Sequence, residues 1–171
     1  MIKIVFTGPE CSGKTTLSIE IAKKFNAPLV QEYAREYLEN IQREYNYNDL
    51  IQIAKGQLKI EQECSKKTNQ LLICDTNLQV IKIWSQIKYN KCDSFILKNL
   101  DSEAYYVLCY PDFPWEYDPL RENKHDRIKL VKYYHQDLIE NNYKFIIARG
   151  SHEQRMSFLE SSIKKMIIQS F

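Results

Sequence analysis

The 171-residue sequence has no apolar run that approaches the length of a membrane span. It has no block of like charge either, and its formal net charge of +2 is too small to indicate a nucleic-acid or membrane partner. It also lacks internal repeats, low-complexity segments and linkers. We therefore expect one domain over residues 1–171, long enough to bury a proper core, with no signal peptide ahead of it.

The cysteines are odd in number and include no C-x-x-C pair. They are Cys11, Cys64, Cys74, Cys92 and Cys109. Two of them, Cys74 and Cys109, fall in apolar runs that we expect to be buried strands. This pattern is typical of reduced thiols and not of a disulfide framework or a zinc site, so we expect a cytoplasmic protein.

The sequence contains one strong motif, G-x-x-x-x-G-K-[ST], at residues 8–15. The apolar run at residues 2–7 before it is typical of a buried strand. After it, Leu17, Ile21 and Phe25 recur at helical spacing. Strand, glycine-rich loop and helix in this order are the context in which the motif binds phosphates. The alternative, a glycine turn followed by a chance Lys-Thr pair, does not require either flanking element.

The residue types of the loop suit a nucleoside triphosphate with Mg²⁺. Backbone N–H groups of the loop and of the first helical turn would face the phosphate oxygens. Lys14 would reach the β- and γ-phosphates, and the Thr15 hydroxyl would bind Mg²⁺. The predicted ATP-binding residues of the loop are Gly8, Glu10, Cys11, Ser12, Gly13, Lys14, Thr15 and Thr16.

Apolar runs alternate with helical patterns along the whole chain. Strands are expected at residues 2–7, 29–33, 71–76, 105–110 and 144–149. Helices are expected at residues 16–25, 33–44, 50–66, 78–88, 126–140 and 151–166, with Gly56 interrupting the third. This alternation predicts an α/β fold in three α/β/α layers with a parallel sheet of about five strands. In such sheets ligands bind beyond the carboxyl ends of the strands.

Three charged residues follow the expected strands. Asp75 closes the third strand, where an acid can hold the Mg²⁺ of the nucleotide or can cap the next helix. Glu32 and Arg35 follow the second strand. Glu32 could accept a proton from an acceptor hydroxyl and Arg35 could bind substrate, or the two could form a surface ion pair. The spacing favours neither interpretation.

Residues 111–128 are too long for a tight turn and are rich in proline, polar and aromatic side chains. This composition predicts a lid. Arg121 and Arg127 on such a lid could move onto the transferring phosphoryl group and exclude water. Pro119 would make the lid stiffer than a glycine at that position.

The same segment carries candidates for binding a nucleoside. Trp115 is either an anchor of the loop in the core or a stacking surface for a flat ring. Asp112 and Asp118 could bond sugar hydroxyls, or could only solvate the loop.

Four blocks together resemble a known family. They are the loop at 8–15, Q-E-Y-A-R-E-Y-L at 31–38, C-D-T at 74–76 and D-F-P-W-x-x-D-x-x-R at 112–121. In this order they resemble the nicotinamide riboside kinases, and most closely the kinase module of the NadR proteins and its stand-alone relatives. The resemblance runs from residue 2 to about residue 155 and implies a P-loop kinase-like fold.

The resemblance also implies an activity, the ATP-dependent phosphorylation of the 5′-hydroxyl of nicotinamide riboside to nicotinamide mononucleotide in NAD salvage. The implied roles are Trp115 on the nicotinamide ring, Asp112 and Asp118 near the ribose, Arg121 and Arg127 near the phosphates, Glu32 as base, Asp75 on Mg²⁺, and Arg155 with residues 149–151 towards the adenine. The partner would be a small-molecule acceptor. Two alternatives stay open, a kinase for another nucleoside or nucleotide and a non-catalytic ATP-binding regulatory module.

Overall fold

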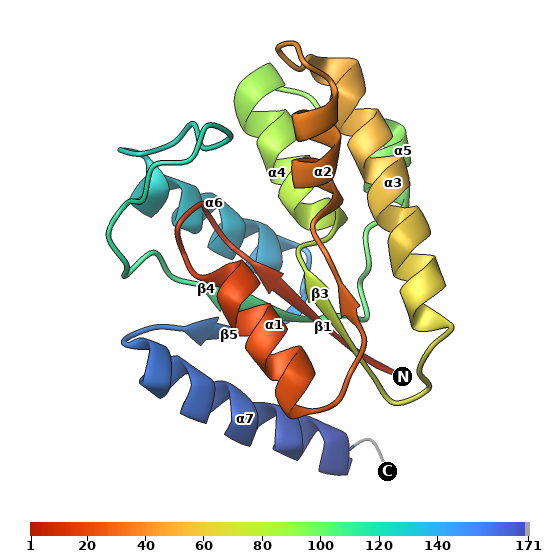
Figure 1. Cartoon of the computed structure of the whole chain (residues 1–171), viewed down its shortest axis with the longest axis vertical. Coiled ribbons are helices and arrows are strands. Elements are labelled where there is room, and N and C mark those ends of the chain that lie inside the picture. The colour runs from red at the N-terminus through yellow and green to blue at the C-terminus, as the bar shows by residue number, and fades with distance from the viewer. Residues whose placement is uncertain (170–171) are drawn as a thin grey trace.

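A parallel sheet of five strands forms the centre of the molecule (Figure 1). The computed structural model describes residues 1–169, and the statements below concern that part of the chain. The strands are β1 (Ile2–Thr7), β2 (Leu29–Val30), β3 (Leu71–Asp75), β4 (Tyr105–Cys109) and β5 (Lys144–Ala148). Their order is β2-β3-β1-β4-β5, and each adjacent pair is parallel. The strand that precedes the phosphate loop therefore lies in the middle of the sheet.

The register of the central strands positions the ends that matter for function. Phe6 pairs with Asp75 across β1 and β3, so the acid lies beside the start of the phosphate loop. All five residues of β3 are buried, as expected for a parallel strand that is covered on both faces.

Seven helices surround this sheet. They are α1 (Lys14–Lys24), α2 (Tyr33–Asn40), α3 (Tyr47–Ser65), α4 (Leu78–Tyr89), α5 (Ser94–Lys98), α6 (Arg127–Glu140) and α7 (His152–Gln169). On one face, α1 and α7 pack against the sheet in a core that includes Phe6, Leu17 and Ile163. On the other face, α4 and α6 pack through Ile83 and Val131. The predicted three-layer α/β/α fold is confirmed.

A smaller apolar cluster joins α2, α3, α4 and α5 at one end of the molecule (Figure 1). Its buried residues are Ala34, Leu50, Ile53, Ala54, Leu78, Ile81 and Ile96. The lid segment is the long teal loop that leads into α6 (Figure 1). Within the described residues, no helix is both long and apolar enough to cross a membrane.

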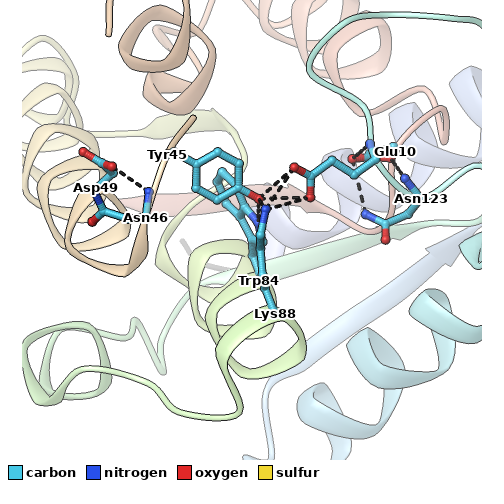
Figure 2. Close-up of polar contacts among 8 residues, drawn as sticks. Glu10, Tyr45, Asn46, Asp49, Trp84, Lys88 and Asn123 are labelled. Carbon is cyan, nitrogen blue, oxygen red and sulfur yellow. Dashed lines mark hydrogen bonds and ion pairs between the residues drawn. The ribbon is translucent and has the colours of Figure 1, made fainter. Parts of the chain in front are cut away.

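Some boundaries differ from the expected ones, each for a local reason. Strand β2 ends at Val30 because Glu32 already occupies the N-cap position of α2. Helix α3 begins at Tyr47, three residues earlier than expected, because Asn46 and Asp49 form a capping box, with Asp49 Oδ2 2.7 Å from the Asn46 N–H (Figure 2). The short helix α5 was not anticipated, since five residues give too little periodicity to detect.

Gly56 does not interrupt α3, which continues unbroken through it. A Cβ atom at Gly56 would lie 1.9 Å from Cε1 of Tyr33, the first residue of α2. The glycine is therefore explained by the close approach of the two helices rather than by a break.

Candidate active site

The phosphate loop has the backbone conformation that its glycines predict. Gly8 and Gly13 adopt φ of 128° and 83°, in the region that favours glycine. A Cβ at Gly8 would lie 2.6 Å from the Cys109 carbonyl oxygen, so the loop passes closely over the end of β4. Gly13 is the N-cap of α1 and supplies no side-chain bond to its first turn. The N–H groups of that turn are therefore available to an anion.

Lys14 and Ser12 both bond the loop itself. The Lys14 ammonium and the Ser12 hydroxyl each donate to the Pro9 carbonyl oxygen at 2.7 Å. The structure thus places the predicted Lys14 charge at the loop, beside the backbone amides that would receive phosphates.

Asp75 lies under the start of α1 as a buried carboxylate, with 4% of its surface exposed. It is hydrogen-bonded to the Thr15 side chain, while its Oδ1 is the one buried side-chain N or O atom among the described residues that has no partner. Burial raises the pKa of Asp75, and the Thr15 bond and the Lys14 charge oppose that rise. A buried, unpaired carboxylate oxygen next to a threonine hydroxyl fits a hard cation such as Mg²⁺.

The alternative role of Asp75 as a helix cap is not observed. Asn77 is the N-cap of α4, and its side chain accepts a bond from the Gln79 N–H at 3.0 Å. The Asp75 carboxylate is therefore left to face the loop.

Glu32 is half-buried where β2 passes into α2, and it makes no capping bond to that helix. The buried Gln57 side chain accepts from the Tyr33 N–H at 2.9 Å and donates to the Gln31 carbonyl at 3.3 Å. It therefore fixes the backbone on both sides of Glu32. Burial raises the pKa of Glu32; the Lys14 charge opposes that rise and the Asp75 charge adds to it, so the two carboxylates lie close enough to interact.

Glu32 lines a cavity of about 600 Å³ that runs from the phosphate loop to α4. Its loop end is lined by Gly8 to Thr16, and Glu32 and Arg35 lie beside that end. Its far wall is formed by Val80, Ile83, Trp84, Ile87 and Lys88 of α4, with Ala34 and Leu38 of α2. The lid contributes Phe113, Pro114, Glu116 and residues 120–123, and α6 and α7 add Leu130, Tyr134 and His152. Volumes of this order accommodate small-molecule ligands.

Of the predicted substrate-binding residues, Glu32 and Arg35 line the cavity, whereas Asp112, Trp115 and Asp118 are outside its lining. Trp115 does not line the cavity, and its ring lies 5.8 Å from the Arg127 guanidinium. Asp112 accepts from the Gly150 N–H at 2.7 Å, at the end of β5. Asp118 accepts from Arg35 of α2 at 2.7 Å. Asp112 and Asp118 thus have different partners, and their roles at a ribose stay a prediction.

Three aromatic side chains line the cavity: Phe113 of the lid, Tyr134 of α6 and Trp84 of α4. Trp84 was not among the predicted site residues. The residue does pack inward, edge-on to Tyr45 at 4.8 Å, and its indole N–H donates to the Tyr45 hydroxyl at 2.9 Å. The sequence did contain one signal that Trp84 could line a ligand site. Trp84 is on the helix that follows Asp75, and that helix begins at the carboxyl end of the sheet, where ligands bind.

Arg155 does not lie where the resemblance implied. Its side chain is fully buried, so no surface remains for contact with an adenine. It donates to the carbonyls of Ser12 and Tyr110, each at 2.8 Å, and to Asp112 at 2.9 Å. Arg155 therefore supports the phosphate loop from behind, and its assignment to the nucleotide base is corrected.

The two lid arginines, Arg121 and Arg127, lie in different places. Arg121 lines the cavity and donates to the Glu116 carbonyl at 2.8 Å. Arg127 donates to the Phe113 carbonyl at 2.8 Å and to the Cys11 carbonyl at 3.3 Å, which ties the start of α6 to the phosphate loop. Of the two, Arg121 is the one that lines the cavity, and the roles of both at a phosphate stay predictions.

The sheet order and the phosphate loop together define a P-loop protein with a kinase-like fold. The chain belongs to the AAA domain family, whose model matches residues 3–155.

The resemblance to NadR is confirmed by sequence and by structure. The chain is 24% identical to the trifunctional NAD biosynthesis/regulator protein NadR of Salmonella typhimurium, over 96% of this chain and 42% of the relative. It thus spans less than half of that relative. The crystal structure of a NadR protein in complex with NR matches 97% of this chain and 51% of its own with a TM-score of 0.80 at 19% identity. A Mycoplasma mycoides deoxyadenosine kinase matches 96% of this chain and 100% of its own with a TM-score of 0.70 at 17% identity.

Proposed function

We propose that the protein is an ATP-dependent kinase that phosphorylates the 5′-hydroxyl of nicotinamide riboside, giving nicotinamide mononucleotide for NAD salvage. The observation that carries the proposal is a cavity that is lined by the phosphate loop, by Glu32 and by Trp84 of α4. A phosphoryl donor and a flat nucleoside would meet at Glu32 in such a cavity.

The proposed reaction is an in-line transfer. The loop amides and Lys14 would hold the donor phosphates, and Mg²⁺, held by Thr15 and Asp75, would neutralise charge on them. The acceptor oxygen would attack the γ-phosphorus of ATP while the bond between the γ-phosphorus and the β-phosphate oxygen breaks, which releases ADP. Glu32 would take the hydroxyl proton, since burial raises its pKa towards that of a general base. Asp75 is the competing base, because it lies close enough for its charge to raise the pKa of Glu32.

Nicotinamide riboside is favoured as acceptor by two similarities. The Salmonella relative is named for NAD biosynthesis, and a NadR structure that contains NR has a TM-score of 0.80 to this chain. The runner-up is a kinase for another nucleoside. It is supported by the deoxyadenosine kinase, which matches along its full length as a chain of similar size.

An ADP-release assay with ATP and Mg²⁺ tests the proposal. The wells contain nicotinamide riboside, deoxyadenosine, cytidine, uridine, thymidine or no acceptor, and a Lys14→Ala variant is the control. We expect ADP release to be at least about 100-fold faster with nicotinamide riboside than without acceptor, and to be lost in the control. Equal rates in every well would contradict the kinase assignment, and a preference for deoxyadenosine would select the runner-up.

A further inference from the structure

The phosphate loop carries an acidic side chain, Glu10, that is directed towards the lid. A carboxylate beside a triphosphate is electrostatically unfavourable, so its position calls for another partner. Glu10 accepts from the backbone N–H of Asn123 at 2.9 Å and from that of Glu122 at 3.1 Å (Figure 2). The Asn123 side-chain amide adds a longer bond at 3.5 Å. The donor side of the cavity thus holds the lid through one carboxylate.

The acceptor side holds one of these two lid residues, Glu122. Both oxygens of the Glu122 carboxylate lie 3.0 Å from the Tyr45 hydroxyl oxygen. Lys88 also donates to the Glu122 carboxylate, at 3.1 Å. The Tyr45 hydroxyl also accepts from Trp84 and Lys88, so four side chains converge at the far wall (Figure 2). Trp84, Lys88 and Glu122 all line the cavity.

Glu122 and Asn123, here called the strap, therefore connect the phosphate loop to the acceptor wall across the cavity. A third connection lies nearby, where Arg35 of α2 bonds Asp118 of the lid at 2.7 Å. The strap contacts are individually weak, because Lys88 and Glu122 remain 36% and 46% exposed. Several weak bonds that act together can hold the lid closed over a filled site and still let it open for the exchange of ligands.

We propose that Glu10, Tyr45 and Glu122 are positioning residues that keep the strap closed, so that the γ-phosphoryl group passes to the acceptor and not to water. The proposal rests on the proposed kinase function. Water excluded from the cavity cannot compete with the acceptor hydroxyl for the same phosphorus atom. Glu122 bonds the phosphate loop through its backbone N–H and the far wall through its carboxylate, so release at either end loosens the strap.

The ratio of ADP formed to acceptor phosphorylated tests the proposal. Tyr45→Phe removes the hydroxyl and keeps the ring, Glu122→Ala removes the carboxylate, and Glu122→Gln restores an accepting oxygen. We expect a ratio near one in the wild type, a ratio raised about threefold or more in Tyr45→Phe and Glu122→Ala, and partial rescue in Glu122→Gln. The matched control is Glu63→Ala, an exposed carboxylate of α3 outside the cavity lining. An unchanged ratio in both variants would overturn the proposal.

A second measurement needs no acceptor. Hydrogen exchange at the amides of Glu122 and Asn123 is compared between the wild type and Glu10→Ala. We expect exchange about tenfold faster in the variant, because both amides lose their acceptor. If no nucleoside is phosphorylated, the proposed function fails while the exchange data still decide whether the strap is held closed. If exchange is unchanged, the strap is wrong even in an active kinase.

Discussion

The Asp75 carboxylate is buried at the end of β3 with one oxygen unpaired, a feature that destabilises the ligand-free fold. Burial raises the pKa of Asp75, so the folded state binds its proton more tightly than the unfolded state does. The free energy of unfolding therefore increases as the pH falls through this raised pKa. At higher pH Asp75 is ionised in the folded protein, and the loss of stability caused by this buried charge is then complete.

Asp75→Asn should therefore have opposite effects on stability and on turnover. Without Mg²⁺ and ATP we expect a higher Tm than the wild type at pH 7, and a difference that shrinks as the pH is lowered. Turnover should fall by about 100-fold, because the amide is a poorer cation ligand. Thermal unfolding between pH 4.5 and 8, together with ADP release, measures both. A variant that is less stable than the wild type at pH 7 would contradict the destabilising role of this carboxylate.

At the scale of single residues, the sequence predicted the donor half of the site better than the acceptor half. Lys14, Thr15 and Asp75 were predictable because a contiguous motif and a strand end fix their positions. Trp84 and Arg155 were not, since an inward-facing aromatic residue and a helical arginine have the same local patterns whether they line a cavity or support a core. Asp112 and Asp118 were paired by the resemblance, but in the structure Asp112 bonds Gly150 and Asp118 bonds Arg35.

Among the elements, the contact between α2 and α3 is the one that sets the position of Glu32. Gly56 lets the Tyr33 ring lie against the α3 backbone, and Gln57 bonds the chain on either side of Glu32. Gly56→Ala would add helix propensity worth about 1 kcal/mol, yet the overlap with Tyr33 would cost about 1–3 kcal/mol.

We expect Gly56→Ala to lower the free energy of unfolding by about 1 kcal/mol as the net of these two terms. It should also lower turnover while leaving the KM for ATP unchanged, because Glu32 moves and the phosphate loop does not. Lys55→Ala, at the exposed position beside it in α3, is the control for helix propensity. Urea unfolding and steady-state kinetics measure both effects. A Gly56→Ala protein that is more stable than the wild type would contradict the packing interpretation.

The boundaries of the elements illustrate why periodicity alone falls short. The runs that became β1, β3 and β4 are long, apolar and bounded by turns, so their positions could be predicted. Strand β2 is only Leu29–Val30, because the chain leaves the sheet to place Glu32 at the start of α2. The end of a strand that leads into a site is set by tertiary contacts, here those of Gln57, which no local pattern contains.

Across the whole molecule, Arg155 of α7 joins the C-terminal helix to the phosphate loop near the N-terminus. Its guanidinium bonds three carbonyls and one carboxylate while fully buried. Loss of such a group leaves several buried acceptors unpaired.

Arg155→Met should lower the free energy of unfolding by about 3 kcal/mol and raise the KM for ATP, because the loop loses its support. Arg149→Met is the matched control. Arg149 is 61% exposed and lies over the Tyr110 ring at 3.9 Å, so its loss should cost less than about 1 kcal/mol. Chemical denaturation of both variants makes the comparison. Equal losses of stability in the two variants would show that the buried contacts of Arg155 stabilise the fold no more than the exposed contacts of Arg149 do.

The bond between Arg155 and Ser12 joins residues 143 positions apart. A ribosome makes the phosphate loop first, but the side chain that holds the loop from behind emerges only after most of the chain has been synthesised. Contacts of such long sequence separation form late, since the intervening chain must first be brought together. The loop would therefore gain its nucleotide-binding geometry as one of the last steps of folding, and a nascent chain that stops before Arg155 would carry the motif without its support.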